Sequence, residues 1–258
     1  MLLLSLMTAT AAHAAGDGVL YYTGHSGFSV SSYFPPSIPE DVIVNDECGT
    51  WTETSSWPSD LSTYRMVILM IPSNTWSTSE TQQIQDFIDD GGVLVAVGDS
   101  SGYDSAHVSP MNTLLTDLGV SSQLQTAAID SGCSGNQAPA ATTHALTDGI
   151  SSTGIQFGWS SDITLGSGAT ELFTGGSGQV IAAVEGQVIL ISDINVFIDD
   201  CTLNSDSRQF IANMYHYGTS TNSCDMDGDG YDAEHCGGLD CDDSVSYTHL
   251  RAHETVVY

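Results

Sequence analysis

The chain has 258 residues, a formal net charge of −29 and only three basic side chains against 32 acidic ones. Nucleic-acid binding through phosphate contacts needs clustered Lys and Arg, so this composition all but excludes that class and disfavours anionic membrane surfaces. Because 41% of the residues are hydrophobic, a sizeable core is possible, and the length accommodates one domain of about 200 residues with a small additional module.

The first 14 residues have the pattern of a secretion signal. A short apolar run over residues 2–7 is followed by Ala12-His13-Ala14, which fits the small-residue cleavage site of such signals. The positive charge that usually precedes the apolar run is missing. Either the start of the chain is misassigned or the gene fragment is clipped at this end. We expect residues 1–14 to be a signal peptide, the protein to be secreted or held at the cell surface, and no further segment to enter a membrane.

Short apolar runs alternate with helical patterns between residues 15 and 217, which is typical of an α/β domain. The run over residues 65–71 is almost entirely apolar and stops at Pro72, as expected of a central parallel strand that is covered on both faces. The predicted strands of the first half are 19–22, 41–44, 65–71 and 93–97.

The clearest helix lies between the third and fourth of these strands. Ser77-Thr78-Ser79-Glu80 fits a capping box at its start, and Gly91-Gly92 ends it. Its apolar residues Ile84, Phe87 and Ile88 share one face. Because a strand follows directly, we expect a right-handed β-α-β unit with two parallel strands.

The second half is richer in strands. A helix is expected from Ser109-Pro110 to Gly119, since proline is favoured at the first helical position. Gly186 predicts a tight reversal between two strands that then form a hairpin. A final helix is expected over residues 205–217. The predicted strands are 155–159, 170–174, 180–184 and 188–192.

One loop carries a pattern with catalytic potential. Gly98-Asp99-Ser100-Ser101-Gly102 fits G-x-S-x-G and follows a buried strand, but further loop residues intervene before the next helix can start. In a hydrolase, Ser100 would be the nucleophile and His107 or His144 its base. The alternative, which the pattern favours, is a Gly- and Ser-rich loop at the carboxyl end of a sheet strand.

The succession of residues 87–99, 111–120 and 144–150 resembles the glutamine-amidotransferase-like domains of gliding proteins, ABC-transport auxiliary proteins and intraflagellar transport components. The resemblance implies an α/β fold of flavodoxin type over residues 15–217, a three-layer sandwich with a mostly parallel sheet. It also implies that the catalytic Cys-His-Glu set is mostly lost and that the domain serves binding or assembly. The serine at position 100 does not match the cysteine chemistry of that family.

Other candidates for ligand binding lie in loops. His25 follows the first strand, where open α/β sheets place ligands. Trp51, Trp57 and Trp76 lie in Ser- and Thr-rich loops, where exposed indoles could stack on sugars, although capping the core is the commoner role. His144 opens a His-Ala-Leu-Thr-Asp-Gly element, in which a structural turn is expected.

Six cysteines are present, an even number that favours disulfides in a secreted protein. No C-x-x-C pair exists, so a structural zinc site has little support. The connectivity stays open at this point, although Cys133 and Cys201 are the best candidate pair within the α/β domain.

After a linker at residues 218–223, the chain has the pattern of a calcium loop. Aspartates at alternate positions from Asp225 can turn three carboxylates toward one hard cation, and the interspersed glycines let the backbone curl tightly. The loop is not a true EF-hand, because Cys236 stands at loop position twelve, where an EF-hand has glutamate. The predicted Ca²⁺ ligands are Asp225, Asp227, Asp229, Tyr231, Asp232, Glu234, Asp240 and Asp242.

Segments 225–231 and 239–243 are similar to the metal-binding repeat of myxobacterial-type surface proteins and to thrombospondin type 3 calcium repeats. The resemblance implies a truncated calcium-binding repeat over residues 224–243. The string at residues 245–255 instead resembles a translated sequencing adapter. We therefore expect residues 244–258 not to be biological.

These patterns together predict a secreted or cell-surface calcium-binding protein with a non-catalytic α/β domain for binding or assembly. Its ligand or protein partner is unknown, and Ca²⁺ is the one cofactor expected. A secreted serine hydrolase that uses Ser100 is the first alternative, and a carbohydrate-binding module is the second.

Overall fold

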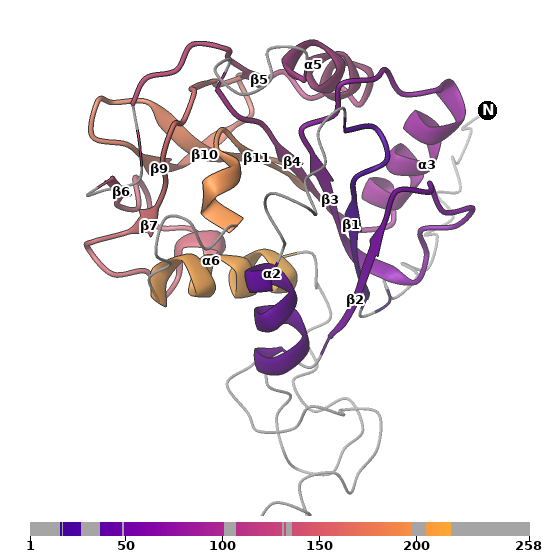
Figure 1. Ribbon diagram of the computed structural model, residues 1–258, viewed down its shortest axis with the longest axis horizontal. Helices are drawn as coiled ribbons and strands as arrows, with labels where there is room; N and C mark the ends of the chain where they lie inside the picture. Colours follow the sequence, from indigo (N-terminus) through magenta and orange to yellow (C-terminus); the bar gives the residue numbers. More distant parts are fainter. Residues whose placement is uncertain are drawn as a thin grey trace, which may run out of the picture.

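A seven-stranded sheet forms the centre of the fold. The computed structural model describes residues 16, 18–26, 37–47, 49–100, 107–130, 132, 136–197 and 205–217. The strands are hydrogen-bonded in the order β2-β1-β3-β4-β11-β10-β9 (Figure 1). Their bounds are β1 Gly18–Tyr22, β2 Thr50–Thr54, β3 Tyr64–Met70, β4 Val93–Val97, β9 Thr170–Thr174, β10 Val180–Glu185 and β11 Val188–Ile191.

Most of the sheet is parallel. β1 pairs in parallel with β2 and β3, and β4 pairs in parallel with β3 and β11. β10 is antiparallel to both β11 and β9, so the sheet ends in an antiparallel edge. The parallel part follows the strand order of flavodoxin-like folds. The predicted fold class, a flavodoxin-like α/β domain with a mainly parallel sheet, is confirmed.

Helices cover both faces of this sheet. Successive residues of a strand point to opposite faces, so Met66 and Ile68 belong to the core beneath α6, whereas Val67 belongs to the core beneath α3 and α5. Figure 1 shows α6 lying beside α2, away from α3 and α5. The helices are α2 Ser37–Asp41, α3 Thr78–Asp89, α5 Val108–Asp117 and α6 Ser205–His216. None of the helices in the described segments has the length and apolar character needed to cross a bilayer.

The capping box predicted for α3 is present. The Glu80 backbone N–H donates to the Ser77 hydroxyl (3.3 Å), and the Ser77 N–H donates to the Glu80 carboxylate (2.8 Å). Ile84 and Phe87 are buried against the sheet, as their shared face predicts. β3 and β4, which flank α3 in the sequence, are parallel neighbours, so the expected β-α-β unit is formed.

The prediction of a second strand over residues 41–44 is wrong. This segment is the end of α2 and the start of a π-helical turn, η1 (Val42–Asp46). The turn buries Ile43 in the core and directs Asp41 to the guanidinium of Arg208 on α6, with 2.7 Å between Nη1 and Oδ2. A short apolar run fits a buried helix as well as a strand, and here the contact with α6 decides the outcome.

The strand beside β1 is instead β2 (Thr-Trp-Thr-Glu-Thr), which is polar apart from Trp51. It forms the edge of the sheet, bonds only to β1, and its side chains are mostly exposed. A strand with so little buried surface leaves no hydrophobic pattern from which it could be predicted.

The second half matches its prediction in part. β9, β10 and β11 form where expected, and Gly186 (φ +62°) makes the reversal of the β10–β11 hairpin. The strand expected over residues 155–159 is shorter and ends at Gln156, and Trp159 could not belong to it, because its φ of +56° is not extended backbone. The remaining elements are β5 Gln123–Leu124, paired with β8 Ile163–Thr164; β6 Gln137–Ala138, paired with β7 Ile155–Gln156; and the turns η2 Ala145–Thr147 and η3 Ile194–Phe197.

Candidate functional site

A buried polar cluster lies where β4 and β11 end. The two strands are parallel neighbours, with Val97 opposite Ile191, so the residues that follow them meet at the carboxyl edge of the sheet. Open α/β sheets bind ligands at this edge. The cluster, called here the carboxyl-edge site, consists of Asp99, Ser100, His107, Asp193 and Asn195, each at most 5% exposed.

Asp193 is the most enclosed acid of this site. Its carboxylate accepts hydrogen bonds from the Gly158 N–H (2.6 Å), the Asn195 N–H (2.8 Å) and the Asn195 side-chain amide (2.9 Å). Burial nevertheless raises the pKa of Asp193 well above its ordinary value, and the charge of Asp99 raises it further. The three donors act in the opposite direction but do not offset the cost of a buried charge.

Asp99 lies in a similar environment. Its Oδ1 accepts a hydrogen bond from the Ser100 N–H (2.6 Å). Burial raises the pKa of Asp99 to about 7, and the charge of Asp130 adds to the effect. Both carboxyl groups therefore resist ionisation and retain protons under conditions in which an exposed aspartate has lost its own.

His107 lies next to the predicted nucleophile loop, but the ring nitrogen that would act as the base, Nε2, is already hydrogen-bonded. His107 Nε2 accepts a hydrogen bond from the Asp99 backbone N–H (2.9 Å). A ring nitrogen that accepts a hydrogen bond carries no proton, so the imidazole is neutral with its proton on Nδ1. The Nε2 lone pair is directed at the main chain rather than at the Ser100 hydroxyl.

His144 has the structural role expected of it. The His144 ring nitrogen Nδ1 accepts a hydrogen bond from the Leu146 N–H (3.1 Å). The His144 backbone N–H donates to the Thr147 hydroxyl (3.0 Å), and the two bonds together cap η2. The ring lies 5.5 Å from that of Tyr217, and η2 packs on α6. These hydrogen bonds stay within the turn and do not lead to Ser100.

His25 lies at the carboxyl end of β1, as expected, within an aromatic group. Its ring stacks on Trp76, with centroids 4.2 Å apart and planes 3° apart, and Nε2 lies 3.1 Å from a Glu80 carboxylate oxygen. The Tyr22 ring lies 5.8 Å from that of Trp76 and 4.9 Å from that of Trp57. His25 thus packs against aromatic rings and pairs with Glu80, which indicates a structural role for this residue.

The three tryptophans predicted to lie in loops serve mainly to cover the core, and the placement of Trp51 in a loop is wrong, because it lies in β2. Trp51 lies 5.4 Å from the ring of Tyr21 and packs on the core beneath α6. Trp57 and Trp76 are half-buried against the core on the other face. The commoner of the two predicted roles is therefore the one observed.

Trp159 is a surface residue that the sequence patterns do not single out. It is 40% exposed and adjoins the carboxyl-edge site, since Gly158 is hydrogen-bonded to both Asp193 and Asn195. Its φ of +56° is left-handed, a conformation that costs a residue with a Cβ roughly 1–2 kcal/mol. In the segment 155–159, only Gly158 indicates that the strand could end, and no neighbouring residue predicts a tryptophan with left-handed backbone.

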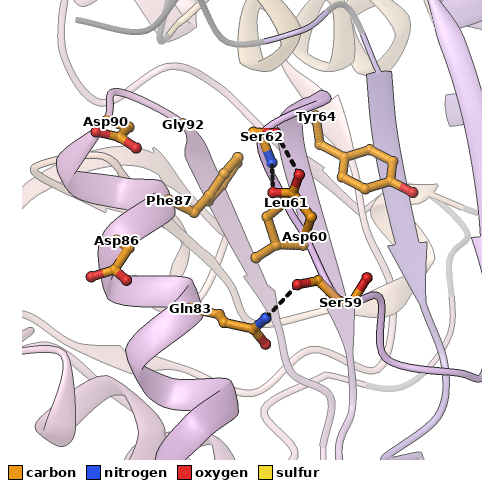
Figure 2. Close-up of a pocket in the computed structure, with 10 residues that line it drawn as sticks. All are labelled: Ser59, Asp60, Leu61, Ser62, Tyr64, Gln83, Asp86, Phe87, Asp90 and Gly92. Carbon is orange, nitrogen blue, oxygen red and sulfur yellow. Dashed lines mark hydrogen bonds between the residues drawn. The ribbon is translucent and has the colours of Figure 1, made fainter.

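A small cavity lies at the opposite edge of the sheet (Figure 2). It has a volume of about 150 Å³ and lies between the end of α3 and the loop that enters β3. Phe87 points into it, and Gln83 spans one side by donating to the Ser59 carbonyl (2.9 Å). This is the amino edge of the sheet, away from the edge at which α/β folds bind ligands, so the carboxyl-edge site is the better candidate.

The predicted calcium loop, with its ligands from Asp225 to Asp242, lies outside the described residues. The same holds for residues 1–14, 218–223 and 244–258 and for all six cysteines. Within the part of the chain that the structure describes, no three His, Cys, Asp or Glu side chains are grouped so that they could hold a metal ion. Calcium binding and the disulfides stay predictions.

Solved structures share this fold. The N-terminal domain of mmIFT52 has a TM-score of 0.61 at 11% identity, covering 79% of this chain and 98% of that one. A ThuA-like protein from Bacteroides uniformis has a TM-score of 0.53 at 11% identity, covering 81% and 94%. A glutamine amidotransferase from Thermotoga maritima is a weaker likeness that does not by itself show a shared fold, with a TM-score of 0.48 at 11% identity, covering 70% and 76%.

At these identities the likeness concerns the fold alone. It agrees with the flavodoxin-like architecture read from the strand order. No protein-family model matches the chain, and the comparison with curated proteins finds no match either.

Proposed function

We propose that this chain is a secreted or cell-surface calcium-binding protein whose α/β domain binds a ligand or partner and does not catalyse a reaction. One observation carries the non-catalytic part of the proposal: His107 Nε2 accepts the Asp99 N–H. General-base catalysis requires a lone pair within reach of the proton to be removed, and this lone pair is bonded to the main chain.

The surroundings of Ser100 also favour binding over hydrolysis. Ser100 is 2% exposed, and its N–H is bonded to Asp99. With its pKa raised to about 7, Asp99 is a poor substitute for the ionised aspartate that orients and stabilises a catalytic imidazole. His144, the second predicted base, is bonded within its own turn.

The calcium part of the proposal rests on the alternating aspartates that begin at Asp225. Extracellular modules bind Ca²⁺ with a Kd of about 10⁻⁴ to 10⁻³ M, which suffices outside the cell. Bound Ca²⁺ also offsets part of the net charge of −29, which otherwise opposes compact structure through self-repulsion.

A serine hydrolase that uses Ser100 is the competing function. One observation favours it: Ser100 closely follows the carboxyl end of β4, a buried central strand, which is where an α/β-hydrolase places its nucleophile.

A fluorophosphonate probe, which labels activated serines, separates the two functions. We expect no labelling of the full chain at Ser100, and the same signal from wild type and Ser100→Ala, because neither predicted base directs its bonded ring nitrogen at the hydroxyl: His107 Nε2 accepts the Asp99 N–H and His144 Nδ1 accepts the Leu146 N–H. A known serine hydrolase labelled in parallel is the positive control. Labelling of the wild type that Ser100→Ala abolishes would contradict the non-catalytic proposal.

A further inference from the structure

An arch formed by Gly158, Trp159 and Ser160 displays an indole ring at the carboxyl edge of the sheet. Trp159 is 40% exposed, although the residues on either side of it are buried. Its left-handed φ of +56° interrupts the buried run from Phe157 to Ser161. A strained backbone that exposes a large aromatic side chain is a feature of binding sites more than of cores.

Hydrogen bonds to the buried Asp193 and Asn195 on one side and to the half-buried Asp130 on the other fix this arch. Gly158 donates its N–H to Asp193 (2.6 Å) and accepts a hydrogen bond from the Asn195 side chain. Ser160 donates its N–H (3.2 Å) and its hydroxyl to Asp130. The indole is thus held by a loop that is ordered on both sides, and a ligand that stacks on it has little left to immobilise.

From this geometry we infer that the arch binds neutral carbohydrate, with the Trp159 indole stacked on the C–H face of a sugar ring. The inference rests on the proposed function, since it names the ligand class of a domain that binds rather than catalyses. A rigid indole supplies a flat apolar surface of about the size of one sugar ring. The Asp130 carboxylate next to the arch already accepts hydrogen bonds from Ser160, Asn136 and Gln179, so its role is to hold the arch, and the indole face supplies the contact with the sugar.

The charge of the chain selects among ligands. With 32 acidic and three basic residues, the protein repels acidic glycans and phosphorylated ligands, which leaves uncharged sugars as the glycans that fit.

A protein partner fits less well than a sugar. A specific protein interface buries roughly 800 Å² on each side and is anchored by a cluster of aromatic and apolar residues. Within the described residues, the exposed large hydrophobic side chains are Val44, Ile129, Trp159 and Leu165. Only Ile129 adjoins the arch, by donating its N–H to the Ser160 carbonyl (3.0 Å). Two such side chains cover a sugar unit but not a protein interface.

The test is a titration of the full chain with neutral oligosaccharides, in which tryptophan fluorescence and isothermal titration calorimetry detect binding. The oligosaccharides are cellohexaose, xylohexaose, mannohexaose and N-acetylchitohexaose. We expect saturable binding of at least one of them, weakened at least about tenfold by Trp159→Gly. Glycine tolerates a positive φ, so this variant removes the indole without straining the arch. Trp159→Phe, which keeps a ring, should retain part of the affinity.

Leu165→Ala is the matched control, because it removes an exposed apolar side chain elsewhere on the domain and should bind like wild type. Binding to none of the neutral oligosaccharides overturns the inference, as does equal binding by wild type and Trp159→Gly. Binding restricted to an acidic glycan such as polygalacturonate, or a Trp159-dependent association with a protein alone, also overturns it. In each of these cases a calcium response and an absence of Ser100 labelling would leave the proposed function standing.

Discussion

Asp99 and Asp193 show how position changes the chemistry of a common residue. In the sequence they are ordinary loop acids, far apart in the chain. Because β4 and β11 are neighbours in the sheet, the two carboxyl groups become part of one buried cluster and influence each other. Burial raises the pKa of both, so that at neutral pH the core holds less charge than the sequence suggests.

Asp99→Asn should change the dependence of stability on pH. From about pH 4 to about pH 7 the folded Asp99 keeps a proton that the unfolded chain has lost, so the free energy of unfolding falls as pH rises through this window. Asparagine cannot ionise and still offers an oxygen to the Ser100 N–H. We expect the loss of stability between about pH 4.5 and about pH 8 to shrink by on the order of 2–4 kcal/mol in this variant, measured by urea unfolding.

The general repulsion among acidic groups also depends on pH, so this measurement needs a charge-matched control. Asp117→Asn removes one negative charge from an exposed position on α5 and should leave the slope close to that of wild type. Parallel pH profiles for wild type and Asp99→Asn would show that Asp99 does not titrate as a buried acid.

Among the elements, α3 is the one in which local sequence and tertiary role are most closely connected. Its capping box fixes the first turn, and the same turn places Glu80 against His25 at the end of β1. Helix geometry thereby orders a loop at the carboxyl edge of the sheet. The cap was predictable because all of its groups lie within four consecutive residues.

Ser77→Ala should destabilise the domain by about 1 kcal/mol, because the Glu80 N–H loses its side-chain acceptor. Thermal and urea unfolding measure the change. Ser79→Ala, in the same turn but exposed and outside the box, should stay within about 0.5 kcal/mol of wild type. Equal effects of the two substitutions would mean that the cap contributes nothing specific.

At the scale of the whole molecule, the fold could be predicted from the sequence better than the site. Buried strands such as β3 and β4 are continuous apolar runs, and their type follows from composition alone. The polar edge strand β2 and the helical turn at Ile43 could not be found in this way, because their states depend on a neighbour rather than on local pattern. The same holds for Trp159, whose exposure is set by hydrogen bonds to residues remote in sequence.

The proposed function joins two regions with different roles. The α/β domain supplies a carboxyl edge at which Asp99 and Asp193 are buried and the His107 lone pair is bonded to the main chain. In this proposal the segment after residue 223 would supply the acidic residues for Ca²⁺, which is the reason to expect an extracellular setting. We propose binding, rather than turnover, as the activity of both regions.

Calorimetric titration of the full chain with Ca²⁺, together with its Tm at millimolar Ca²⁺, tests the central claim most directly. We expect saturable heat and a higher Tm, both lost when Asp225, Asp227 and Asp229 are changed to Asn, because a hard cation needs their carboxylates. A variant that loses the same charge from the exposed residues Asp89, Asp117 and Asp148 should respond like wild type. Absence of heat and of any Tm shift, or equal responses from the two triple variants, would contradict the account.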